Sequence, residues 1–263
     1  MSIRKVLPAI VLCLLGGGCY RPQPTSVPLR TLPVASALPE GGERCLVVLL
    51  PGRGDKPEDF VTNDFAVTLR QAGSTCEVLA VDAHLGYYYE GIIDTRLRED
   101  VIVPALARGI EEVWLVGISL GGLGSILYTR DHPGEVAGVV LLAPFLGPDE
   151  VVNEVEEAGG LSRWTPTEPL AERDLRRLWL WLKRYDAAAP RQPPIYLAYG
   201  QGDRFARKNA LMAEALPEDH VFVLPGGHTW RTWRRLWSAV LDAGVVPGKT
   251  AGRLRRATTG SSR

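Results

Sequence analysis

The chain has 263 residues, of which 46% are hydrophobic and 23% are charged. Its 30 basic and 30 acidic side chains cancel to a formal net charge of zero. This composition is that of a globular protein and excludes a chain that is disordered throughout. Because no net basic charge is available to attract a phosphate backbone, nucleic acid is not an expected partner. We expect one domain, long enough to bury a core without metal or disulfide support.

Residues 1–18 are predicted to be an export signal. Two basic residues precede an apolar run at 6–15, which as a helix spans roughly half of a bilayer's hydrocarbon core. Three glycines and Cys19 follow, and this end resembles the lipobox at which bacterial lipoproteins are cleaved and lipidated. The resemblance implies a lipid on Cys19 and an exported protein anchored to a bacterial membrane. A plain secretory signal, which would give a secreted protein, is the alternative.

Two flanking segments are predicted to lie outside the folded domain. Residues 19–43 contain Pro22, Pro24, Pro28 and Pro33, a density that disfavours helices and sheet ladders and predicts an extended, semi-rigid tether. Residues 247–263 carry basic side chains among Gly, Thr and Ser, and they are predicted to form a disordered tail. The folded domain is therefore expected to span residues 44–246.

Short, nearly continuous apolar runs predict strands that are covered on both faces of a sheet. These strands are expected at residues 45–50, 76–81, 112–117, 136–142, 194–199 and 220–224. Helices are expected between and after them, at residues 57–71, 92–108, 120–130, 206–216 and 230–243. The alternation predicts a doubly wound, mostly parallel α/β sheet of about six strands. Residues 147–192 are too many for a simple crossover and are predicted to form a helical cap insertion.

A candidate nucleophile lies in the segment Gly117-Ile118-Ser119-Leu120-Gly121, which has the G-x-S-x-G pattern. The segment directly follows an apolar strand and opens a helical stretch, which is the setting that this pattern requires. Such an abrupt turn forces the central residue into a strained conformation, and the flanking glycines leave room where a Cβ would collide with backbone. Ser119 is therefore predicted to project at the top of the sheet. The alternative is a Gly-rich turn in which Ser119 only caps the helix.

A serine hydroxyl needs an imidazole to remove its proton and a carboxylate to orient that imidazole. Asp203 follows the fifth predicted strand and His228 follows the sixth. Both loops leave the carboxyl ends of parallel strands, as the serine does, so the three side chains are expected to meet at one edge of the sheet. The alternatives are a helix-capping Asp203, with Asp149 as the reserve acid, and a surface role for His228.

The elbow and the order Ser, Asp, His resemble the α/β-hydrolase superfamily, and the resemblance covers residues 45–243. It implies an oxyanion hole formed by the backbone N–H groups of Leu120 and Arg53, which are pre-oriented donors for the charge that develops during attack. The chain departs from the usual pattern at Pro51, where many members have histidine. It also lacks the usual first hairpin of the sheet among its predicted strands.

The family's sheet order also makes the strands that begin with Cys45 and Cys76 neighbours. Adjacent strands lie roughly 5 Å apart, a spacing that is compatible with a disulfide. Because an exported domain folds in an oxidising compartment, we expect a possible disulfide between these two residues. Two buried free thiols are the alternative.

Aromatic residues near the catalytic edge are candidates for the substrate pocket. Tyr87 and Tyr88 follow the second predicted strand, and Trp179 lies in the predicted cap. Side chains of this kind suit an apolar acyl or aryl group, while packing between cap and body is the alternative. The helical spacing of Trp230 and Trp233, which continues to Trp237, predicts a core-facing stripe.

The sequence thus predicts a serine hydrolase that cleaves carboxylic esters through an acyl-enzyme on Ser119. In this interpretation His228 acts first as base and then as acid, and Asp203 orients it. The expected substrate is a small-molecule acyl ester, and neither a metal nor another cofactor is expected. The alternatives are a peptidase or a thioesterase that uses the same triad, and a hydrolase-fold binding protein without turnover.

Overall fold

The computed structural model describes residues 23–35, 44–167, 169–171, 174–185, 192–245 and 247–248. The predicted signal, the predicted lipidation site Cys19 and most of the predicted tail lie outside these ranges. At the start of that tail, the carbonyl of Pro247 accepts a hydrogen bond from the Ser74 hydroxyl at 2.8 Å. The packed part of the chain therefore extends slightly beyond the predicted boundary at residue 246.

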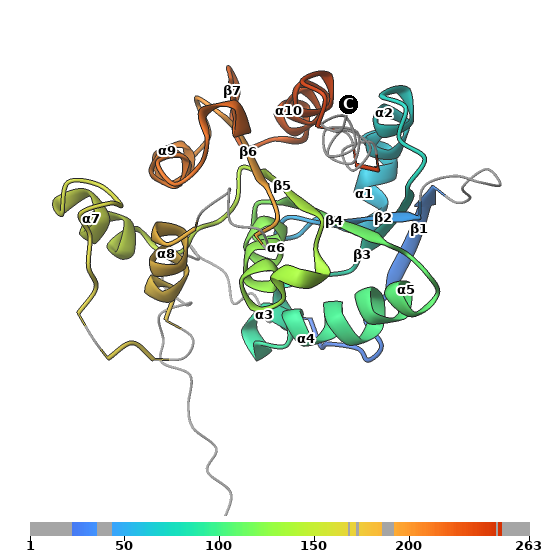
Figure 1. Ribbon diagram of the computed structural model, residues 1–263, viewed down its shortest axis with the longest axis horizontal. Helices are drawn as coiled ribbons and strands as arrows, with labels where there is room; N and C mark the ends of the chain where they lie inside the picture. The colour runs from blue at the N-terminus through green and yellow to red at the C-terminus, as the bar shows by residue number, and fades with distance from the viewer. Residues whose placement is uncertain are drawn as a thin grey trace, which may run out of the picture.

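One sheet organises the molecule, with the strand order β1-β3-β2-β4-β5-β6-β7 (Figure 1). Its strands are β1 (Thr31–Ala35), β2 (Cys45–Leu50), β3 (Glu77–Val81), β4 (Glu112–Ile118), β5 (Gly138–Leu142), β6 (Ile195–Gly200) and β7 (Val221–Leu224). All neighbours from β3 to β7 pair in parallel. Every residue of β2, β5 and β6 is buried, which explains their unbroken apolar runs. The predicted doubly wound α/β sheet is confirmed.

Strand β1 corrects the prediction that residues 19–43 form only a tether. Residues 31–35 pair antiparallel with β3, and Thr31 lies opposite Val81. The proline content excludes a central strand, but an edge strand has one side without a partner and can place a residue that lacks an N–H there. Pro33 lies in this edge strand, and the register shifts between Pro33 and Ala35. The sheet therefore has seven strands, one more than expected.

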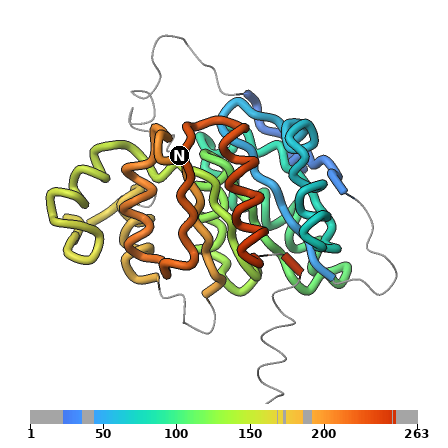
Figure 2. The backbone as a smooth tube through the Cα atoms, turned by 90° about the horizontal axis from the view of Figure 1, so that it is seen from above, coloured from blue at the N-terminus to red at the C-terminus, as the bar shows by residue number. Residues whose placement is uncertain are grey.

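Helices cover both faces of the sheet (Figure 1). One face carries α1 (Pro57–Thr62), α2 (Phe65–Gln71) and α10 (Trp230–Asp242), and the other carries α3 (Leu85–Glu90), α4 (Ile93–Leu97), α5 (Val103–Ala107) and α6 (Leu120–Asp131). Figure 2 shows α10, in red, beside the blue and cyan α1–α2 region. There the ring of Trp237 stacks on Phe65 at 5.8 Å, and its Nε1 donates to the Phe65 carbonyl at 3.1 Å.

Two predicted helices are interrupted for local reasons. The stretch predicted at 57–71 divides into α1 and α2 because Asp64 adopts a left-handed conformation with φ of 59°. The stretch predicted at 92–108 contains a π-helical turn, Arg98–Ile102, between α4 and α5. Pro104 follows this turn and has no N–H to donate to the preceding turn, so regular α-helical bonding cannot continue through it.

The predicted cap is helical, with α7 (Asp149–Glu157) and α8 (Arg176–Lys183) lying beside the sheet at the left of Figure 1. Helix α9 (Ala206–Ala213) lies between β6 and β7 in the chain and contacts the beginning of this cap. Lys208 of α9 is buried, and its Nζ donates to the Gly147 carbonyl at 2.6 Å and pairs with Asp149 at 2.8 Å. The hydrogen bond from Lys208 lowers the pKa of Asp149. Asp149, the alternative candidate for the catalytic acid, therefore binds Lys208 and not His228. Across the described ranges, no helix is both long and apolar enough to cross a membrane.

A disulfide joins Cys45 and Cys76, whose Cα atoms lie 4.7 Å apart. The parallel register places Leu46 opposite Glu77, so Cys45, which begins β2, lies beside Cys76, which directly precedes β3. Both residues are buried in the core. A disulfide of this kind persists in oxidising compartments and is compatible with the expected export.

Removing this disulfide is expected to lower the free energy of unfolding by about 3 to 4 kcal/mol, because it closes a loop with a sequence separation of 31 residues. Urea unfolding of Cys45→Ala/Cys76→Ala beside the wild-type protein measures the difference. Reductant should destabilise the wild-type protein and leave the double variant unchanged. Equal stability of the two oxidised proteins would contradict the assigned contribution.

Candidate active site

Ser119 lies at the sharp turn between β4 and α6, with φ of 51° and ψ of −110°. A Cβ on Gly121 would lie 2.1 Å from the Leu50 carbonyl oxygen, and one on Gly117 would lie 2.4 Å from the Gly121 oxygen. Only glycine fits at either position, because both obstacles are backbone atoms. The Ser119 N–H donates to the Leu142 carbonyl at 3.0 Å, and these contacts hold the turn although its central residue is strained.

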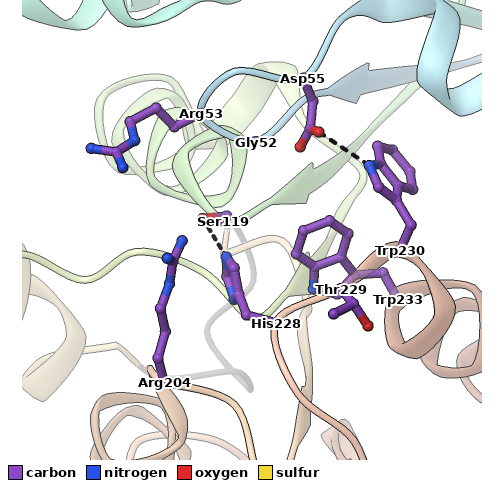
Figure 3. Close-up of a pocket in the computed structure, with 9 residues that line it drawn as sticks. All are labelled: Gly52, Arg53, Asp55, Ser119, Arg204, His228, Thr229, Trp230 and Trp233. Atoms are coloured by element: carbon purple, nitrogen blue, oxygen red, sulfur yellow. Dashed lines mark hydrogen bonds between the residues drawn. The ribbon is translucent and has the colours of Figure 1, made fainter. Parts of the chain in front are cut away.

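The three predicted catalytic side chains form one hydrogen-bonded chain. His228 Nδ1 lies 2.8 Å from Asp203 Oδ2, and His228 Nε2 lies 3.0 Å from Ser119 Oγ, as the dashed line in Figure 3 shows. The Asp203 side chain is fully buried and also accepts a hydrogen bond from the Phe205 N–H at 2.8 Å. A carboxylate accepts a hydrogen bond from Nδ1–H and so keeps the proton on Nδ1, which leaves Nε2 as the acceptor for the serine proton. The loops after β4, β6 and β7 thus meet at one edge of the sheet.

Two aromatic rings hold the plane of the His228 imidazole. The rings of Phe205 and Trp233 lie 5.0 Å and 4.9 Å from it, both in an edge-on arrangement. Trp230 packs against Trp233 at 5.3 Å and extends this aromatic wall. Because the imidazole is fixed by rings as well as by the Asp203 carboxylate, its Nε2 stays directed at Ser119.

The predicted oxyanion donors, the N–H groups of Arg53 and Leu120, lie on the two segments that flank Ser119. A Cβ on Gly52 would lie 3.5 Å from the Ser119 Cβ, so the loop that carries Arg53 runs directly against the serine. Within the described part of the chain, the Arg53 N–H makes no hydrogen bond. Leu120 is the first residue of α6, where backbone N–H groups have no partner inside the helix. Both N–H groups are therefore available to an anion formed beside Ser119.

The Ser119 and His228 side chains line a cavity of about 380 Å³ (Figure 3). Its lining comes from the loop after β2, the turn at Ser119, and the segments that follow β6 and β7: Gly52, Arg53, Asp55, Ser119, Arg204, His228, Thr229, Trp230 and Trp233. Within the described ranges, no group of three His, Cys, Asp or Glu side chains could hold a metal ion. The cavity combines charged groups with an indole wall.

The pocket residues predicted from the aromatic pattern do not line this cavity. Tyr87 is buried, and its hydroxyl donates to the Ser26 carbonyl at 2.9 Å, so it fastens the N-terminal segment. The Tyr88 hydroxyl is enclosed near Gly124, and burial raises its pKa well above the usual range. Trp179 is also buried and donates to the Leu146 carbonyl at 3.0 Å. All three are packing residues, which was the alternative interpretation.

Other residues line the cavity that the sequence reasoning did not assign to it. Asp55 lies two positions beyond the predicted oxyanion donor, and Arg204 directly follows the predicted acid. Their position on the same loops was the signal that could have identified them. Trp230 and Trp233 were predicted to face the core, and Trp233 is indeed buried, but both also form a wall of the cavity. The tryptophan stripe therefore continues from the core into the site.

Asp55 is the acidic side chain on the cavity wall. Its Oδ1 accepts a hydrogen bond from Trp230 Nε1 at 3.1 Å, and Figure 3 shows the carboxylate directed into the cavity. Burial is the largest effect on this group and raises its pKa, although the hydrogen bond from Trp230 acts in the opposite direction. The carboxylate thus helps to fix the Trp230 indole, which lies beside it in the cavity lining.

Comparisons with known proteins agree with this architecture. Residues 103–242, more than half of the chain, match the family described as "Putative esterase". The fold is similar to that of a ferulic acid esterase, with 16% identity, 79% of this chain and 87% of the other covered, and a TM-score of 0.54. It is also similar to S-formylglutathione hydrolase from Staphylococcus aureus, with 13% identity, 76% and 80% covered, and a TM-score of 0.52.

A third solved structure, the esterase Est1E from Butyrivibrio proteoclasticus with ferulic acid bound, has 15% identity and a TM-score of 0.51, and 82% of this chain and 94% of the other are covered. Identities this low show a shared fold only. A search of curated proteins found no match. From the family match and the sheet topology together, the chain belongs to the Esterase family and has the α/β-hydrolase fold.

Proposed function

We propose that this esterase-family protein hydrolyses carboxylic esters, with Ser119 as a covalent nucleophile. The observation that carries the proposal is the continuous hydrogen-bonded chain from the buried Asp203 through His228 to Ser119, which opens into a cavity. A binding protein without turnover would not require a buried carboxylate, an oriented imidazole and a strained serine in this order. The arrangement therefore favours catalysis.

In the first half of the reaction, Ser119 Oγ attacks the ester carbonyl carbon while His228 Nε2 takes the hydroxyl proton. The carbonyl oxygen becomes an oxyanion, which the N–H groups of Arg53 and Leu120 stabilise. When this tetrahedral intermediate collapses, the bond to the alcohol breaks and the imidazolium gives its proton to the departing oxygen. The acyl group remains on Ser119 and the alcohol leaves.

In the second half, a water molecule replaces the alcohol. His228 Nε2 takes one proton from the water as its oxygen attacks the acyl carbon, and the same N–H groups stabilise the second oxyanion. Collapse breaks the bond to Ser119 Oγ, which recovers its proton from the imidazolium. The products are a carboxylic acid and the original enzyme. Throughout both halves, the Asp203 carboxylate stabilises the imidazolium and keeps it oriented.

The test is covalent labelling with a fluorophosphonate probe. Wild-type protein is expected to be labelled on Ser119, with the site located by mass spectrometry, and Ser119→Ala should not be labelled. Ser238→Ala, which removes a hydroxyl from α10 outside the cavity, is the matched control and should be labelled as the wild type is. No labelling of the folded wild-type protein, or equal labelling of Ser119→Ala, would refute the proposal.

Substrate series distinguish the ester reaction from its two alternatives. An acetyl group presented as a p-nitrophenyl ester, an anilide and a thioester keeps the acyl part constant and changes only the bond that is cleaved. The highest kcat/KM is expected for the ester, in line with the description of the family. A higher kcat/KM for the anilide or for the thioester would instead identify a peptidase or a thioesterase.

A further inference from the structure

Two arginines line the cavity beside the nucleophile. Arg53 comes from the loop after β2 and Arg204 from the loop after β6, and in the view of Figure 3 both lie on the same side of Ser119. Neither guanidinium makes a hydrogen bond or an ion pair within the described part of the chain. Elsewhere, arginines such as Arg98 and Arg108 are paired with glutamates. The cavity lining therefore carries two guanidinium groups that have no acidic partner among the described residues.

Arg204 stacks on an aromatic ring and has no acidic partner in the part of the chain that the structure describes. Its guanidinium carbon lies 4.9 Å from the centroid of the Phe205 ring, and that ring in turn contacts the His228 imidazole at 5.0 Å. Stacking on an aromatic face leaves the edge of a guanidinium available for hydrogen bonds. The chain of contacts thus places a bidentate donor next to the reacting groups.

Other charged groups near the site offset these arginines only in part. Asp55 lies opposite them in Figure 3 and is hydrogen-bonded to Trp230. Asp203 is fully buried beneath the imidazole and is occupied by it. Lys208 lies 5.5 Å from the Phe205 ring, but its ammonium already binds Gly147 and Asp149. The cavity lining therefore carries two arginines against one carboxylate, and its balance of charge is positive.

We propose that the preferred substrate is an anionic ester, in which a carboxylate or phosphate group is bound by Arg53 and Arg204. A carboxylate is planar and a phosphate is tetrahedral, and each can accept two parallel hydrogen bonds from one guanidinium group. The indole wall of Trp230 and Trp233 then contacts the uncharged part of the same molecule. This inference rests on the proposed esterase function and names the class of ester on which that function acts.

Matched substrates test the preference. Mono-p-nitrophenyl glutarate and its methyl ester share the acyl length and the leaving group and differ in one negative charge. We expect kcat/KM to be about 10- to 100-fold higher for the anion, as hydrogen bonds to charged groups allow. An acylglycerol 3-phosphate beside the corresponding acylglycerol forms the phosphate arm. A preference in either arm supports the proposal and identifies the group, whereas no preference in both arms overturns it.

Variants assign the effect to the cavity. Arg204→Gln is expected to reduce the anionic-to-neutral ratio of kcat/KM by about 10-fold, while Arg204→Lys should retain more of it because the charge remains. Arg231→Gln removes an equal charge from the exposed surface of α10, outside the cavity lining, and should leave the ratio within about twofold. An equal fall in Arg231→Gln would show that only the general surface charge acts, and would overturn the assignment.

The two levels of the proposal fail in different ways. If Ser119 is labelled and neutral esters are hydrolysed at the same rate as anionic ones, the esterase function stands and the anionic preference is wrong. If neither ester is hydrolysed and Ser119 is not labelled, the esterase function itself is wrong. Measuring labelling and the two rates on the same preparation therefore separates these results.

Discussion

His228→Ala is expected to lower kcat for ester hydrolysis by about 10⁴- to 10⁶-fold, because it removes the imidazole nitrogen that lies 3.0 Å from the Ser119 hydroxyl and is placed to accept its proton. The residual rate would come from substrate binding and from the oxyanion donors, which the substitution leaves in place. Steady-state kinetics with a p-nitrophenyl ester measures the loss, and circular dichroism confirms that the variant is folded. Activity within tenfold of the wild-type value would show that the imidazole is not the base.

Asp203→Asn tests the same chain of groups at its other end. The amide would keep the shape of the carboxylate and could still accept the Phe205 N–H, but its NH₂ group would turn toward Nδ1 and favour the proton on Nε2. We expect a loss of kcat of about 10⁴-fold from this wrong tautomer. Combining it with His228→Ala should add almost nothing, since the two residues act as one unit. Additive losses would contradict that unit.

Gly121→Ala is expected to destabilise the fold by about 3 kcal/mol or more, at the upper end of what overpacking costs. The new Cβ would lie 2.1 Å from the Leu50 carbonyl oxygen, which is backbone of a central strand and cannot rotate away. Either β2 or the start of α6 must move, and the second movement displaces the Leu120 N–H. The melting temperature and kcat, measured on the same sample, should therefore both be lower than those of the wild-type protein.

Gly134→Ala is the matched control for this substitution. Gly134 lies in a short 3₁₀ turn, and nothing lies within 4 Å of the Cβ position. The same chemical change there should alter stability by less than about 1 kcal/mol and leave kcat unchanged. If both variants lost stability equally, the collision at the elbow would not be the cause.

The sheet could be predicted because its central strands are buried on both faces and so are apolar without a break. The loops that carry Ser119 and Asp203 follow such strands, and the loop that carries His228 follows the partly buried edge strand β7. Parallel pairing brings the ends of all three strands to one edge. Local sequence was therefore enough to identify the side chains that the structure brings together. The family's sheet order implied that Cys45 and Cys76 lie side by side, and the strand register and the disulfide confirm it.

The remaining features depend on contacts that no local pattern records. Pro33 disfavours a strand by its chemistry, yet β1 forms because β3 offers an open edge. An aromatic side chain near the site can face the cavity or the core, and only packing decides between them. The Tyr87 hydroxyl donates a hydrogen bond to the Ser26 carbonyl, and Trp230 Nε1 donates one to the Asp55 carboxylate. Both contacts join residues that are far apart in the chain.

The attachment of the cap has a consequence for how the site responds to large substrates. Lys208 holds the beginning of the cap, at Gly147, from a helix that starts shortly after Asp203. If the cap moved outward, either the buried Lys208 ammonium would lose its contacts with Gly147 and Asp149, which is costly, or α9 would have to move with the cap. Movement of the cap would therefore also displace the segment that carries Asp203.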